Sequence, residues 1–173
     1  MLSGNSITDT ATANLSVTNL RLEGGSVTLD SASHSVSNLV GSATGNFTFN
    51  NGASALALGS ISGIGGDNDV SSGGSISIST SGAGSNITIA DIGSPAVIST
   101  GTANQTVTIT TNNSNIEESA ANNNTKIRHL NGTVILDAQG TGSIGTAGAI
   151  DVDANSVELK SDNTVIALSL IHI

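Results

Sequence analysis

Short apolar triplets, in which two aliphatic or phenylalanine residues flank one middle residue, recur throughout the chain. Alternation with a period of two predicts a β-strand with one buried face. The glycines and asparagines between the triplets would break any helix. We therefore expect an all-β fold. The clearest triplets lie at residues 15–17, 20–22, 27–29, 47–49, 56–58, 76–78, 87–89, 107–109, 134–136, 150–152 and 157–159.

The apolar side chains limit the kind of β-fold. The chain of 173 residues has two Phe and neither Trp nor Tyr, whereas a β-sandwich core usually contains a buried aromatic residue. Strands stacked in successive coils would instead share a narrow aliphatic core. The sequence thus predicts a parallel β-helix, or β-solenoid, without a globular second domain. Two or three strands per coil would give roughly six to eight short coils.

Charge and composition exclude several classes of function. The chain has 13 acidic and four basic residues, a net charge of −9 and no cysteine. Nucleic-acid binding requires clustered cations to neutralise phosphates, so we exclude it, and we exclude a basic membrane-surface helix on the same ground. No apolar run approaches the ~20 residues of a membrane span. The absence of cysteine excludes disulfides, thiolate metal sites and a cysteine nucleophile.

One stretch of the sequence is a weak candidate for a calcium site. Residues 63–70 read Gly-Ile-Gly-Gly-Asp-Asn-Asp-Val, and Asp67 and Asp69 could supply carboxylate ligands. Calcium-binding β-rolls need tandem copies because successive turns share each ion. Only one copy is present, so we expect a solvated loop, with no cofactor and no other metal ligand.

Two further motifs are interpreted as structural. Residues 140–145 fit Gly-x-Gly-x-x-Gly, with Asp162 downstream, but a nucleotide site would need a helix to begin there, so we expect a coil corner. His34 and His129 have no companion at metal-ligand spacing and are expected on the surface.

Catalytic residues are not expected. Asp151 and Asp153 flank Val152, so both carboxylates should point outward into solvent, and no aromatic sugar platform accompanies them. Ice binding is not expected either, because the Thr-x-Thr motif at residues 106–110 does not recur at a coil period.

The predicted domain organisation is one β-helix repeat fragment over residues 1–167. The stretch 112–130 fits the triplet pattern worst and is expected to be a loop excursion. Residues 168–173, Leu-Ser-Leu-Ile-His-Ile, resemble a translated sequencing adapter, so we expect a non-native tail. A solenoid cut in this way would expose uncapped coils and associate end to end.

Several segments are similar to a known family. Gly-Ser-Val-Thr-Leu-Asp at 25–30, His-Ser-Val-Ser-Asn-Leu at 34–39 and Gly-Thr-Val-Ile-Leu-Asp-Ala at 132–138 resemble the repeats of filamentous-haemagglutinin-like large exoproteins. The likeness covers roughly residues 4–166 and is compositional. It implies a right-handed parallel β-helix in a secreted or surface-displayed bacterial adhesin, exported by two-partner secretion or as an autotransporter passenger. The Asn-Pro-Asn-Gly secretion motif and the Arg-Gly-Asp tripeptide of such proteins are absent.

The function predicted from these observations is a non-catalytic shaft segment at the bacterial cell surface, associated with the outer membrane. Its partners would be neighbouring coils of a longer parent chain, with a host glycan or protein as a possible ligand. One alternative is a glycan- or protein-binding β-helix module, and another is a polysaccharide-active β-helix enzyme such as a tailspike.

Overall fold

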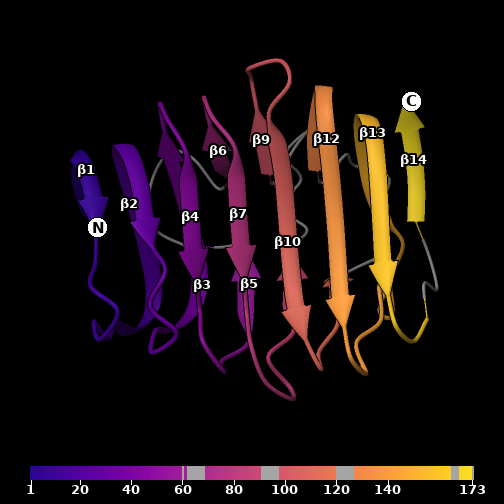
Figure 1. The fold of residues 1–173 in the computed structure, drawn as a ribbon, viewed down its shortest axis with the longest axis horizontal. Coiled ribbons are helices and arrows are strands. Elements are labelled where there is room, and N and C mark those ends of the chain that lie inside the picture. The colour runs from indigo at the N-terminus through magenta and orange to yellow at the C-terminus, as the bar shows by residue number, and fades with distance from the viewer. Residues whose placement is uncertain (60, 62–68, 91–97, 120–126, 165–167, 173) are drawn as a thin grey trace.

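Parallel strands stacked side by side along one axis form the molecule (Figure 1). The computed structural model describes residues 1–59, 61, 69–90, 98–119, 127–164 and 168–172. The strands are β1 (Leu2–Thr8), β2 (Ser16–Leu29), β3 (Ser35–Ala43), β4 (Phe47–Asn50), β5 (Leu56–Leu58), β6 (Val70–Ser72), β7 (Ile76–Ser79), β8 (Ile87–Ile89), β9 (Ile98–Thr100), β10 (Thr106–Asn112), β11 (Ile116–Glu118), β12 (Ile127–Gln139), β13 (Ile150–Ser161) and β14 (Leu168–His172).

All strand pairings between these elements are parallel, and the described residues contain no helix. The predicted all-β architecture, with strands stacked rung by rung, is therefore confirmed. Within the described ranges there is also no helix long and apolar enough to cross a bilayer.

The strand registers define three columns of rungs. The inward residues of the first column are Ile7, Val27, Phe47, Ile76, Val107, Val134 and Val157. Those of the second are Leu2, Leu22, Gly41, Val70, Ile98, Ile127 and Val152. Those of the third are Leu20, Leu39, Leu58, Ile89 and Glu118. The chain runs from third to second to first column and then begins the next coil.

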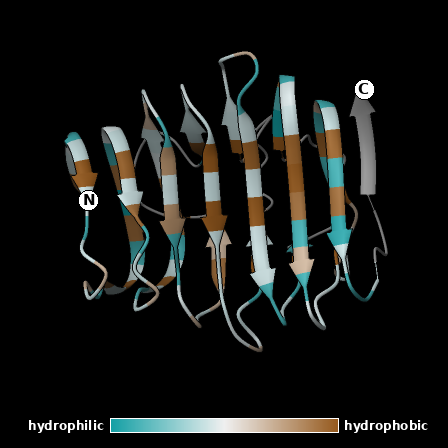
Figure 2. Ribbon diagram, in the orientation of Figure 1, coloured by the Kyte–Doolittle hydropathy of each residue, from teal (hydrophilic) through white to brown (hydrophobic). Residues whose placement is uncertain are grey.

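Hydropathy alternates along strands such as β4, β7 and β10, as the brown and pale bands in Figure 2 show, and the apolar residues at the alternate positions are buried. Phe47, Phe49 and the stacked Ile, Val and Leu residues of the successive rungs belong to one cluster of buried residues. Each such side chain contributes about 1.5–3 kcal/mol when it is fully removed from water. Because no rung encloses a core alone, each coil is stabilised by the coils beside it.

The wide ring of Phe47 in the first column fits because Gly41, beside it in the second column, has no side chain. Gly41 is the one glycine at the inward positions of the second column within the described rungs. A Cβ atom there would collide with the carbonyl oxygen of Leu22 and lie 3.1 Å from Cε2 of Phe47. The large and small residues are therefore complementary across the core.

A polar ladder follows the first column at the corner of the coil. Its inward side chains hydrogen-bond to backbone groups that the turn would otherwise leave unpaired. The Asn51 side chain accepts from Val36 N at 2.7 Å and donates to Val36 O at 2.9 Å. Thr80 Oγ1 donates to Ser85 O at 2.6 Å, and Thr111 Oγ1 donates to Ser114 O at 2.5 Å.

The stretch 112–130 differs from the expected loop in its described part. It contains β11, which stacks on β8, and the beginning of β12, which stacks on β9. The triplet of β11 was missed because Glu118 takes an inward position that the pattern reserves for an apolar residue. Residues 120–126 lie outside the described residues.

At the other end of the molecule, β14 pairs with β13 in parallel. It comprises most of the six residues that we expect to be a translated adapter. The pairing does not distinguish a translated adapter from a natural strand, because any alternating apolar segment can add a strand to an open edge. The adapter origin stays a prediction.

Candidate functional site

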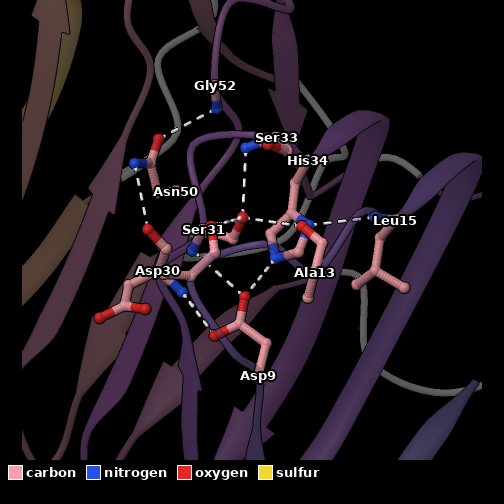
Figure 3. Close-up of polar contacts among 10 residues, drawn as sticks. Asp9, Ala13, Leu15, Asp30, Ser31, Ser33, His34, Asn50 and Gly52 are labelled. Atoms are coloured by element: carbon pink, nitrogen blue, oxygen red, sulfur yellow. Dashed lines mark hydrogen bonds and ion pairs between the residues drawn. The ribbon is translucent and has the colours of Figure 1, made fainter.

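Asp9 and His34 form a buried polar pair at the corner of the first coil (Figure 3). Oδ2 of Asp9 lies 2.7 Å from Nε2 of His34, and their side chains are 6% and 0% exposed. The amide of Leu15 donates to Nδ1 of His34 at 3.1 Å. Because Nδ1 accepts a hydrogen bond, the ring proton is on Nε2, and a neutral imidazole donates to the carboxylate.

The carboxylate of Asp9 accepts further hydrogen bonds from the next coil. The amide of Asp30 donates to Oδ1 at 3.2 Å, and the amide of Ser31 donates to Oδ2 at 3.1 Å. Burial raises the pKa of Asp9, but these backbone donors and His34 together outweigh it and hold the pKa below its usual value. Asp9 is therefore stabilised as a carboxylate.

Ser31 and Phe49 complete the surroundings of this pair. The Ser31 hydroxyl donates to Ala13 O at 2.7 Å, and the His34 ring stacks on Phe49 with centroids 5.9 Å apart. Both ring nitrogens of His34 are engaged in hydrogen bonds with Asp9 and Leu15, so the imidazole has no free lone pair with which to accept a proton from a nucleophile. The cluster ties successive coils together, and the expectation that His34 lies on the surface is wrong.

Beside this pair, the end of the solenoid at β1 is open. A cavity of about 640 Å³ lies there, lined by polar residues of β1 and by Leu2, Ile7, Leu15 and Leu29. Leu2 and Val17 are 40% and 42% exposed. The lining of the cavity therefore combines a core residue, Leu29, which is 3% exposed, with Leu2, which reaches solvent.

The outer edge of β1 pairs with none of the described strands, because β1 stands at the end of the strand order. The amide of Asp9 donates to Thr28 O in β2 at 3.2 Å. Successive amides of a strand point to opposite sides, so the amide of Thr8 points to the free edge. Such an edge, next to an apolar opening, can accept another strand.

His129 is also buried, at 1% exposure. The expectation that it lies on the surface is therefore wrong. Its Nε2 atom lies 2.6 Å from the backbone oxygen of Gln105 in the preceding coil. In the register of β12 with β9, His129 follows Arg128 as Thr100 follows Ser99, so the two residues take equivalent inward positions on successive rungs. A polar residue at that position is hydrogen-bonded to backbone, as Thr100 is to Gly74 O at 3.1 Å.

The expected solvation of Asp151 and Asp153 is also wrong. Asp151 is 4% exposed, and the side chain of Asp153 is 13% exposed. Both residues lie inside the sheet and not on its free edge, because β14 pairs with β13 at both positions. Oδ2 of Asp153 lies 3.7 Å from Nε of Arg128 on the rung before.

Of the calcium candidates, Asp67 lies outside the described residues. Asp69 directly precedes β6, and its backbone oxygen accepts from the amide of Gly41 at 2.9 Å. The described part of the chain contains no group of three or more side chains able to hold a metal ion. The calcium site stays a prediction.

Residues 140–145 form the predicted coil corner. Gly140 and Gly145 have φ values of 65° and 76°, which favour glycine, and strand β12 ends directly before them. Ile144 makes a parallel bridge to Ile116 in the third column. No helix N-terminus is formed by these residues to hold a phosphate.

Single hydroxyl side chains recur in register on the outward side of the first column, although the Thr-x-Thr motif of residues 106–110 does not repeat on the neighbouring rungs. The outward row consists of Thr8, Thr28, Thr48, Ser77 and Thr108, and it continues into Ile135 and Glu158. The row is hidden in the sequence because the rung spacing changes, from 20 residues between Ser6 and Ser26 to 31 between Ser75 and Thr106.

The chain has no match among protein-family models, curated proteins or solved structures.

Proposed function

We propose that the chain is a non-catalytic shaft segment of a secreted or surface-displayed bacterial exoprotein. Its role is to hold a distal binding region away from the cell. The observation that carries this proposal is the stacking of successive rungs in one parallel register, from Ile7 to Val157 in the first column, around a shared core. A repeat of this kind can be extended by further coils in the same register.

The finer description of the fold belongs to the same proposal. We take the solenoid to be right-handed, with six to eight coils. Parallel crossover connections are right-handed in about 98% of cases. The course of the chain supports this winding, because the strands of the first column run down in front and β3, β6 and β9 return behind as the chain advances (Figure 1). Rung after rung of backbone hydrogen bonds makes such a rod stiff.

A glycan- or protein-binding module is the second candidate. The outward hydroxyl row of Thr8, Thr28, Thr48, Ser77 and Thr108 favours it. These five positions carry no charge and share one face, so they could hydrogen-bond to a neutral saccharide. An immobilised glycan panel tests this candidate, and a folded chain that binds no member of the panel would overturn it.

The sequence of the genomic region on either side of the coding segment tests the shaft. We expect a secretion-signal domain upstream and more aliphatic triplets in the same reading frame. Protease treatment of intact cells should then remove the protein without lysis. An upstream region without a secretion signal, together with protection from protease in intact cells, would overturn the proposal.

A further inference from the structure

The connection between β9 and β10 is longer than the equivalent connections in the neighbouring coils. Five residues, 101–105, join these strands, whereas three residues, 73–75, join β6 and β7. The next coil makes the same crossing inside β12, where the pairing with β13 is irregular between His129 and Thr133. The longer connection therefore projects beyond its neighbours, as Figure 1 shows above β9 and β10.

A cavity of about 280 Å³ lies between the projecting connection and the next rung. Thr100, Gly101 and Thr102 line one side, and Arg128 and Asn131 line the other. Its size is near the lower end of the ~300–1,000 Å³ typical of ligand pockets. The space suits a single sugar ring better than a chain of sugars.

A backbone hydrogen bond and the buried His129 ring connect the two sides of this cavity. The amide of Asn104, whose φ is 62°, donates to Asn131 O at 2.9 Å. His129 anchors the end of the connection through Gln105 O at 2.6 Å. Gly132 cannot be replaced by a larger residue, because a Cβ atom there would collide with the His129 ring. The two walls are thus fixed relative to one another before any ligand binds.

Arg128 differs from the other basic residues of the described part of the chain. Arg21 and Lys160 each pair with a glutamate two residues away on their own strand. Arg128 instead pairs through Nε with Asp153 at 3.7 Å, and its side chain is 49% exposed. This ion pair is at the long end of the range, and it leaves the two terminal nitrogens without a partner among the described residues.

We propose that this cavity binds the carboxylate of a sugar acid, independently of the shaft function. The terminal N–H groups of Arg128 match the two oxygens of a carboxylate in a bidentate pair. Ser99 and Thr102 offer hydroxyls, and Asn131 offers an amide, for the hydroxyls of a sugar ring. Asp153 positions the guanidinium by its contact with Nε.

Titration of the full chain with glucuronate, followed by backbone amide NMR shifts, tests the proposal. We expect saturable shifts confined to residues 99–102 and 128–131. Glucose lacks the carboxylate, and acetate and inorganic sulfate lack the ring, so each should bind at least roughly tenfold more weakly. Equal shifts with acetate or sulfate would overturn the sugar-acid assignment, as would equal shifts with glucose.

Three substitutions separate the site from its surroundings. Arg128→Gln should weaken glucuronate binding by roughly tenfold or more. Thr102→Asp, in the exposed connection, should do the same by charge repulsion without altering the core. Lys160→Gln removes an equal charge elsewhere and should leave binding unchanged. Unaltered binding in Thr102→Asp and Arg128→Gln, or equal loss in Lys160→Gln, would overturn the proposal.

Discussion

Nε2 of His34 lies 2.7 Å from Oδ2 of Asp9, although the two residues are 25 positions apart in the chain. The coil brings them together because Asp9 ends one turn of the solenoid and His34 ends the next. The pair replaces apolar packing at this corner with hydrogen bonds, and its two side chains are 6% and 0% exposed. Its main role is therefore to fix one coil against another.

Replacing Asp9 with alanine should destabilise the fold. The substitution removes the acceptor of the amides of Asp30 and Ser31 and of His34 Nε2. The Asp30 amide can turn to water, but the Ser31 amide and His34 Nε2 lie deeper, and each buried donor left unsatisfied costs about 1–3 kcal/mol. Asp9→Ala should therefore lower the free energy of unfolding by at least about 2 kcal/mol, measured by urea denaturation.

Asp30→Ala is the matched control, because Asp30 is exposed and only its backbone takes part in this corner. Its effect should stay within about 0.5 kcal/mol. Equal effects of the two substitutions would show that the Asp9 carboxylate does not hold the corner.

The lowered pKa of Asp9 predicts a loss of stability in acid. Its usual value is 3.8, and the folded value lies below it. The carboxylate thus contributes its full stabilisation above about pH 3.8 and loses it as the pH falls through the folded pKa. The difference in unfolding free energy between the unchanged chain and Asp9→Asn should therefore shrink with acidification from about pH 6 to about pH 2.5. A difference that stays constant over this range would contradict the assignment.

The sequence was sufficient to predict the rungs whose inward residues are all apolar. Residues 27–29, 76–78 and 107–109 alternate clearly, and they stack in register in the first column. Aliphatic alternation between helix-breaking residues leaves few other structures available. The same reasoning accounts for Gly140 and Gly145, whose positive φ values mark the predicted corner.

The sequence was not sufficient where inward positions are polar or where coil length varies. Glu118 and His129 occupy buried positions that no hydropathy pattern distinguishes from surface ones. The meeting of Asp9 with His34 depends on how many residues complete a coil, and that number changes along the chain. Pairings between coils follow from register, which the spacing of triplets does not fix.

Enlarging Gly41 should disturb the core beside Phe47. Gly41→Ala places a Cβ atom against Leu22 O and near the Phe47 ring. Overpacking of this kind typically costs about 1–3 kcal/mol, and urea denaturation should show it. Gly101→Ala is the control, since a Cβ atom there meets nothing within 4 Å. A similar loss in both variants would mean that the cost is not steric.

The free edge of β1 should mediate association between copies of the chain. The purified chain is expected to form end-to-end assemblies that grow with concentration. Thr8→Pro should reduce them, because proline removes the outward amide and places its ring on the edge. The bond from Asp9 N to Thr28 O is retained.

Thr8→Val keeps the amide and serves as the control. Light scattering after size-exclusion chromatography should give a mass near 16.9 kDa for Thr8→Pro and larger masses for the control, with circular dichroism confirming equal strand content. If the unchanged chain stays monomeric at all concentrations, the β1 edge does not accept another strand.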